Sequence, residues 1–176
     1  MSTIGFDTSN YTTSTAWTDG KTDINVRQIL YVKDGERGIR QSDGVFQHMK
    51  LMPVMYEKLS EQIDFKDVKA VGVSTRPRCV EGSYMPVFLA GEGYAKVVAN
   101  TLGVTLYEFS HQDGHIMAGI YSSGSFELLE NDFISVHLSG GTTEILKSRY
   151  NEFNFDNEII GGSKDISAGQ FIDRVG

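Results

Sequence analysis

Two copies of one strand pattern constrain the fold of this chain more than any other feature of its sequence. The first copy occupies residues 4–32 and the second residues 133–160, and each has a strand, a tight turn and a returning strand. The turns fall at residues 8–11 and 139–142 and are rich in hydroxyl residues and glycine. β-Branched residues beside these turns are typical of antiparallel strands. Because the same meander occurs twice, we predict a duplicated α/β fold.

Helices and strands are expected to alternate between the two copies. Apolar residues at helical spacing predict helices over residues 46–63 and 84–102, and compact apolar runs predict strands over residues 68–73 and 104–109. Strands that alternate with helices are typical of an α/β layer structure.

A serine- and glycine-rich segment separates the two halves of the pattern. Residues 122–125 are the best linker candidate, so we predict a first lobe at residues 1–123 and the start of a second at residues 124–176. The chain ends inside an expected helix, and from this we expect a longer protein whose second lobe is only begun here.

Composition narrows the class of protein. A content of 40% hydrophobic residues is enough for a substantial core. The balance of 16 basic against 23 acidic residues, with a pI near 5.0, does not suggest a nucleic-acid partner, so such a contact would need a local basic patch or a partner subunit. Cys79 is alone, and we see neither a signal peptide nor a membrane-length apolar run. We therefore expect a cytoplasmic protein that is not associated with a membrane.

Two of the four histidines lie four residues apart directly after the strand at residues 104–109. Ser110 and Asp113 match a helix-start signal, so His111 and His115 should lie on the first turns of a helix. A spacing of four places both imidazoles on one helical face, where they could share a metal ion. Two ordinary surface histidines are the alternative, because two ligands do not complete a coordination sphere.

The two turns have the chemistry of anion sites. Glycines and hydroxyl residues leave backbone N–H groups accessible to a phosphate, and an acidic residue beside them could hold Mg²⁺. Each turn alone could equally be plain loop composition, but two at matching positions indicate a nucleotide, ATP or an adenylate, clamped between two lobes. The candidate residues are Asp7, Thr8 and Ser9 in the first turn, and Ser139, Gly140, Gly141 and Thr142 in the second.

Four segments carry a resemblance to a known family. Residues 4–9, 111–115, 138–143 and 168–173 resemble, in the family's order, successive signatures of the tRNA N6-adenosine threonylcarbamoyltransferases, also known as the glycoprotease or O-sialoglycoprotein endopeptidase family. Family members are similar in fold to actin, hexokinase and Hsp70, a duplicated ribonuclease H-like α/β fold, and are much longer than this chain. The resemblance therefore implies a complete first lobe and a truncated second one.

The resemblance also implies an activity and a site. It makes His111 and His115 ligands of one iron or zinc ion per subunit, and it assigns nucleotide or substrate binding to His137, Leu138, Ser139, Gly140, Gly141 and Asp173. The implied reaction transfers a threonylcarbamoyl group from threonylcarbamoyl-adenylate to N6 of adenosine 37 in tRNA. The implied partners are tRNA, a paralogous non-catalytic subunit and an ATPase subunit, in a homo- or heterodimer.

Departures from the family pattern leave other functions open. Tyr11 and Thr12 stand where the family has two acidic residues, and Thr142 stands where it has a histidine. A nucleotide-binding, non-catalytic paralogue that acts in assembly is therefore an alternative. A metallopeptidase ranks last, because the two histidines lack the glutamate of His-Glu-x-x-His. No catalytic residue is assigned, and His48 is expected on a helix surface.

Overall fold

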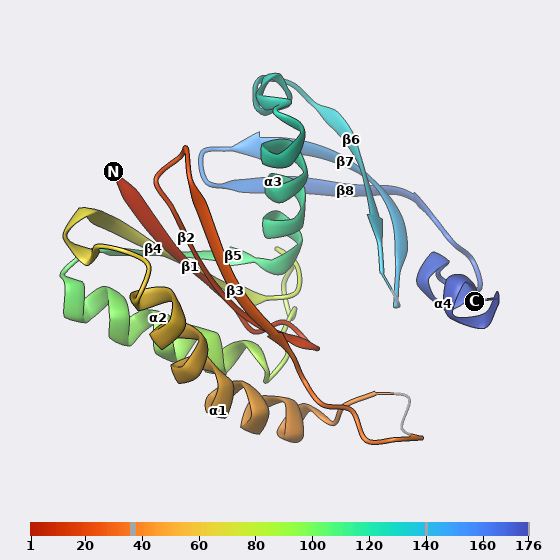
Figure 1. Cartoon of the computed structure of the whole chain (residues 1–176). Coiled ribbons are helices and arrows are strands. Elements are labelled where there is room, and N and C mark those ends of the chain that lie inside the picture. The colour runs from red at the N-terminus through yellow and green to blue at the C-terminus, as the bar shows by residue number, and fades with distance from the viewer. Residues whose placement is uncertain (36–37, 140, 176) are drawn as a thin grey trace. The chain divides into compact units, whose positions relative to one another are not determined.

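The structure, a computed structural model, describes residues 1–35, 38–139 and 141–175. It divides into two compact units, Met1–Gln112 and Asp113–Gly176, and Figure 1 labels the elements of both.

A five-stranded mixed sheet forms the centre of the first unit, with the strand order β3-β2-β1-β4-β5. The meander β1–β3 is antiparallel, whereas β4 and β5 run parallel to β1. Three parallel strands therefore end at the same edge of this sheet. Its strands are β1 (Ser2–Asp7), β2 (Thr12–Thr18), β3 (Asp23–Ile29), β4 (Val68–Arg76) and β5 (Thr105–Ser110).

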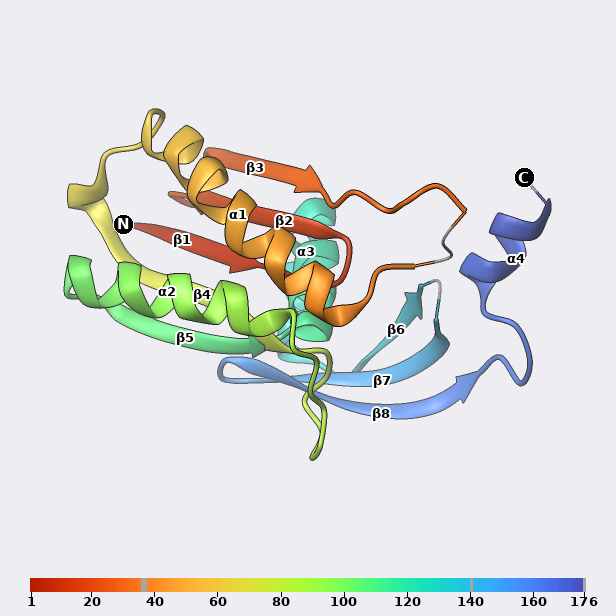
Figure 2. The same ribbon diagram turned by 90° about the horizontal axis from the view of Figure 1, so that it is seen from below.

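Two helices, α1 (Gln41–Ser60) and α2 (Phe88–Leu102), cover one face of this sheet (Figure 2). Alternating residues of β1 and β4 point toward them, and the buried cluster joins these residues to one stripe of each helix. Gly103 ends α2 in the left-handed conformation, with φ of 67°, as its position after the apolar run predicts. The cluster contains Ile4, Phe6, Met52, Leu59, Val68, Val71, Val73, Ala95 and Ala99. A short 3₁₀ helix, η1 (Phe65–Asp67), precedes β4.

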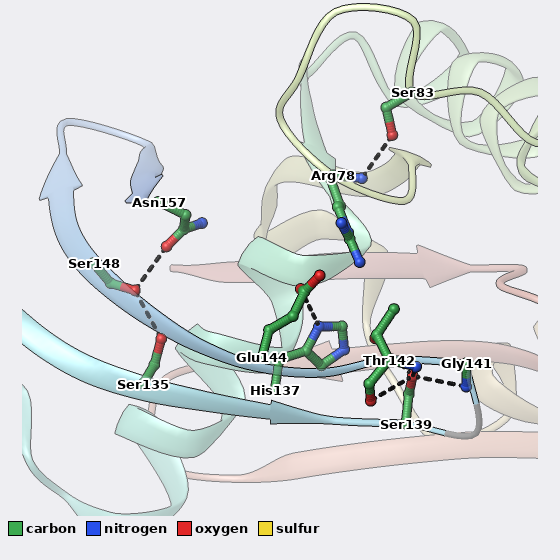
Figure 3. A network of polar contacts seen from close by, with 10 residues as sticks. All are labelled: Arg78, Ser83, Ser135, His137, Ser139, Gly141, Thr142, Glu144, Ser148 and Asn157. Atoms are coloured by element: carbon green, nitrogen blue, oxygen red, sulfur yellow. Dashed lines mark hydrogen bonds and ion pairs between the residues drawn. The ribbon is translucent and has the colours of Figure 1, made fainter. Parts of the chain in front are cut away.

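The second unit is built on a three-stranded antiparallel meander, β6-β7-β8. Its inward side chains include the buried Leu146 and Phe155. The hydroxyl of Ser148 lies 2.7 Å from the hydroxyl of Ser135 and donates to Asn157 Oδ1, also at 2.7 Å (Figure 3). The elements are α3 (His111–Ser123), η2 (Phe126–Glu130), β6 (Phe133–Leu138), β7 (Thr143–Asn151), β8 (Asn154–Gly162) and α4 (Ala168–Val175).

Both predicted meanders are present, and the expected helices and strands occur in the expected order. Helix α1 begins at Gln41, earlier than its apolar spacing predicts, and continues past Pro53. The division between the units falls at Gln112/Asp113 rather than at residues 122–125. Asp113 accounts for part of this difference, because its buried carboxylate accepts a hydrogen bond from the Phe155 backbone N–H at 3.3 Å.

The expectation for His48 was wrong. This residue lies on the inner face of α1 with no exposed surface, and its Nδ1 is 2.7 Å from the hydroxyl of Thr13 on β2. The stripe Gly44, His48, Met52, Met55 and Leu59 is buried, so His48 occupies a core position that an apolar pattern alone does not reveal.

Candidate functional site at the strand ends and on helix α3

The carboxylate of Asp7 lies at the end of β1, where the first predicted turn begins. Its Oδ1 accepts a hydrogen bond from the Ser9 backbone N–H at 2.8 Å. Asn10 then adopts a positive φ of 42°, a conformation that asparagine tolerates better than most residues. The turn thus holds the carboxylate in a defined position.

Asp7 pairs with the first histidine of helix α3. The Nδ1–H of His111 donates to Asp7 Oδ2 at 2.9 Å, and the two side chains are 30% and 26% exposed. They meet because β5 runs parallel to β4, and β4 to β1, so residues that follow β1 and β5 lie at one edge of the sheet. Residues that are far apart in the sequence therefore form one polar centre.

The electrostatics of Asp7 favour its ionised form. Burial alone would raise the pKa of Asp7, but the hydrogen bond and the charge of His111 outweigh burial and lower the pKa to about 2. Hydrogen bonds from Ser74 and Ser9 act in the same direction. An ionised carboxylate on Nδ1 fixes the tautomer of the imidazole, so Nε2 is the nitrogen that could bind a metal or a substrate.

Thr8 supports the turn from inside the protein. It has no exposed surface, its hydroxyl donates to the Val87 carbonyl at 2.8 Å, and it accepts from the Gly91 N–H at 3.1 Å. This candidate for phosphate binding therefore connects the turn to the start of α2 and presents no surface to a ligand.

A charged loop follows β4. The Arg76 guanidinium contacts Thr75 Oγ1 at 3.1 Å and lies 3.7 Å from the sulfur of the exposed Cys79. The Arg78 backbone N–H donates to Ser83 Oγ at 3.0 Å (Figure 3).

In the second unit, the hydroxyl of Ser139 organises the turn between β6 and β7 (Figure 3). It accepts from the backbone N–H groups of Thr142 at 2.9 Å and Gly141 at 3.2 Å, and it lies 2.9 Å from the Thr142 hydroxyl. These N–H groups converge on one oxygen atom, as they would on an oxygen of a phosphate. Gly140 and the side chain of Asp173 lie outside the described part of the structure.

His137 points inward from β6 and lies near His115 and Glu144. Its ring centroid is 5.9 Å from that of His115, and its Nδ1 is 3.9 Å from Glu144 Oε2. Leu138, the next residue, points outward and is 60% exposed, so any part of Leu138 in substrate binding would fall to its backbone.

His115 follows His111 by one turn of α3, as the spacing predicts. The Phe88 ring lies beside His111, with 6.2 Å between the ring centroids. Within residues 1–35, 38–139 and 141–175, no three histidine, cysteine or acidic side chains are grouped so that they could hold a metal ion. The donor set fits iron or zinc in kind, since imidazole suits both metals, but it is incomplete in number.

Comparison with known structures identifies the class of fold. The chain is similar to YeaZ from Pseudomonas aeruginosa, with a TM-score of 0.53 and 10% identity over 93% of this chain and 66% of that one. A second structure from this organism, described as similar to peptidase YEAZ, gives a TM-score of 0.52. The chain therefore has an actin/hexokinase/Hsp70-like α/β fold.

The sequence identifies the family. Residues 36–176 match the family model of tRNA N6-adenosine threonylcarbamoyltransferase, so the chain belongs to this family. The enzyme of this name from Christiangramia forsetii is 31% identical over 70% of this chain and 34% of its own length. The Moorella thermoacetica enzyme is 34% identical over 73% of this chain and 35% of its own, and that of Pyrobaculum calidifontis is 27% identical over 97% and 47%. The chain thus spans about a third to a half of the curated relatives it matches.

No helix in the described part of the chain is long and apolar enough to cross a membrane.

Proposed function

We propose that this chain carries the metal- and substrate-binding groups of a tRNA threonylcarbamoyltransferase. The reaction would transfer the threonylcarbamoyl group from threonylcarbamoyl-adenylate to N6 of adenosine 37 in tRNA. The observation that carries the proposal is the 2.9 Å hydrogen bond between Asp7 and His111, because it joins two of the family-like segments in one centre. Family membership over residues 36–176 supports the choice of reaction.

His111 and His115 would hold one iron or zinc ion. When bound, such an ion supplies a Lewis acid that polarises the carbonyl of the transferred group. Asp7 would act on the protein side by fixing the Nδ1–H tautomer of His111. Because the carboxylate of Asp7 already accepts from His111 and Ser9, its contacts favour this orienting role over Mg²⁺ binding.

The turn at residues 139–142 would bind the adenylate, with its phosphate oxygen replacing the Ser139 hydroxyl on the N–H groups of Gly141 and Thr142. His137, Leu138 and Asp173 would contribute further contacts to the substrate. Binding in this way would orient the carbamoyl group for attack by the adenosine amine. The proposed partners are tRNA, a paralogous subunit and an ATPase subunit, in the cytoplasm.

A nucleotide-binding partner without catalytic activity is the second candidate function. It is favoured by Tyr11 and Thr12, which stand in place of two acidic residues.

A transfer assay distinguishes the two functions. We expect this chain to be inactive by itself, because it spans only about a third to a half of its relatives. A full-length version of the protein is therefore mixed with tRNA, threonylcarbamoyl-adenylate and the two partner subunits, and threonylcarbamoyladenosine is measured by mass spectrometry of the digested tRNA. We expect product with the wild type and little or none with His111→Ala or His115→Ala, while Val136→Ala, on the outer face of β6, serves as the matched control. Adenylate binding without product would favour the non-catalytic partner. The absence of both adenylate binding and product would contradict both functions.

A further inference from the structure

A half-buried arginine, Arg76, lies at the end of β4 without an acidic partner. In the described part of the chain its guanidinium donates to two acceptors, Thr75 Oγ1 at 3.1 Å and the Cys79 sulfur at 3.7 Å. Among the side chains that the structure describes, no carboxylate forms an ion pair with Arg76. The two contacts use two of its five N–H groups. A partly buried positive charge with unused donors is costly unless an anion pairs with it.

An irregularity of the sheet sets the position of Arg76. Strands β4 and β5 lie side by side (Figure 2), and their register shifts at Thr75, which is skipped in the pairing. The Thr75 hydroxyl instead donates to the Phe109 carbonyl at 3.4 Å. Arg76 then pairs with Ser110, the residue before His111. Irregularities of this kind are frequent next to active sites, where they redirect a side chain.

Contacts within the first unit fix the surroundings of Arg76. The Gln112 backbone N–H donates to the Pro77 carbonyl at 3.0 Å, which ties the loop after β4 to the residue that follows His111. Asp7, at the end of β1, does not supply the missing anion, because its carboxylate is already bonded to His111 and to a backbone N–H of its own turn. Arg76 thus adds a positive charge to the sheet edge that holds the Asp7–His111 pair.

We propose that Arg76 binds an oxyanion of the carbamoyl donor, with its guanidinium facing two oxygen atoms of a carboxylate or phosphate group. This inference deepens the proposed function and rests on it for the identity of the donor. Threonylcarbamoyl-adenylate carries both groups, a carboxylate on its threonyl part and a phosphate in its adenylate part. The planar fork of a guanidinium fits either group bidentately. A small anion suits this position better than an RNA backbone does, because Arg76 is partly buried and the chain has a net charge of −7.

Two small probes separate the two anions. N-carbamoylthreonine carries the carboxylate alone, and AMP carries the phosphate alone. Each probe is added to the full chain, labelled with ¹⁵N, while the arginine Nε–H signals are followed by NMR. We expect the Arg76 signal to shift and saturate with at least one probe, and the probe that moves it identifies the anion. The signal of Arg27, which is exposed on the edge strand β3, should stay in place.

Two variants of Arg76 test the contact itself. Arg76→Gln removes the charge, whereas Arg76→Lys keeps the charge and loses the planar fork. Both should weaken binding of the identified probe by at least about tenfold. Arg27→Gln, which makes the same change of charge elsewhere, should bind as the wild type does. Melting of the ligand-free proteins shows whether each variant is folded.

The outcomes separate this inference from the proposed function. Wild-type affinity in both folded Arg76 variants would overturn the inference, as would a wild-type chain that binds neither probe. An effect of Arg76→Gln that is confined to binding of a tRNA anticodon stem-loop would overturn it in favour of a contact with RNA. In the full-length protein, an unchanged KM for the donor in Arg76→Gln would overturn it and leave the proposed function standing. Probe binding through Arg76 without any transfer activity would support the anion site and contradict the proposed function.

Discussion

Folding changes the electrostatic surroundings of the Asp7 carboxylate. Its hydrogen bonds to His111, Ser74 and Ser9 exist only in the folded chain, which is why its folded pKa falls from 3.8 to about 2. A depressed carboxylate pKa contributes stability that is fully present above the unfolded pKa and disappears as the pH falls through the folded pKa.

Asp7→Asn should therefore destabilise the protein near neutral pH. The difference between 3.8 and 2 corresponds to about 2 kcal/mol of unfolding free energy at pH 7, and the deficit should shrink between about pH 4 and pH 2. Urea unfolding at a series of pH values measures this deficit. Asp19→Asn, on an exposed turn, is the control; an equal loss in both variants would contradict the assigned role of Asp7.

The buried His48 should give the stability of the protein a second dependence on pH, in a higher pH range than that of Asp7. Burial lowers the pKa of His48, so the unfolded chain binds a proton more readily than the folded chain. Stability should therefore be greatest above about pH 6.5, the usual histidine pKa, and decline as the pH falls toward the folded pKa. His48→Gln should flatten this decline in melting temperature. An unchanged slope in the variant would show that another group is responsible.

At the scale of elements, helix α2 is seated on the first turn through a contact that requires glycine. A Cβ at Gly91 would lie 2.9 Å from the buried Thr8 Oγ1, whereas a Cβ at Gly93, on the same helix, would meet nothing within 4 Å. The close approach lets the Gly91 N–H reach the Thr8 hydroxyl.

Gly91→Ala and Gly93→Ala should consequently have opposite effects on the free energy of unfolding. The first should lower the unfolding free energy by about 1–3 kcal/mol through overpacking. The second should raise it by about 0.5–1 kcal/mol, because alanine has the higher helix propensity. Urea midpoints at pH 7 measure both changes, and a stabilising Gly91→Ala would contradict the close packing at Thr8.

At the scale of the whole molecule, the first unit contains a complete core. All nine buried residues of its apolar cluster lie between Ile4 and Ala99, on two strands and two helices of that unit. This arrangement predicts that the unit does not need the second one in order to fold.

Residues 1–112 should accordingly fold when expressed alone. We expect a single cooperative urea transition and native-like near-ultraviolet circular dichroism. A shorter chain of residues 1–67 lacks the interior strand β4, with Val71 and Val73, and should show no transition. A non-cooperative transition in residues 1–112 would contradict the independence of the first unit.

Local sequence patterns determined the elements, the two meanders and the helical spacing of His111 and His115, because hydrophobic periodicity and turn chemistry act over a few residues. Only the tertiary structure decided which side chains meet. The Asp7–His111 pair depends on parallel strands that end at one edge, the buried Thr8 on the approach of Gly91, and the His115–His137 contact on the way α3 packs within its unit. His48 was misjudged for the same reason. Its Nδ1 faces the core, where it meets the hydroxyl of Thr13, and such a partner is set by packing rather than by sequence distance.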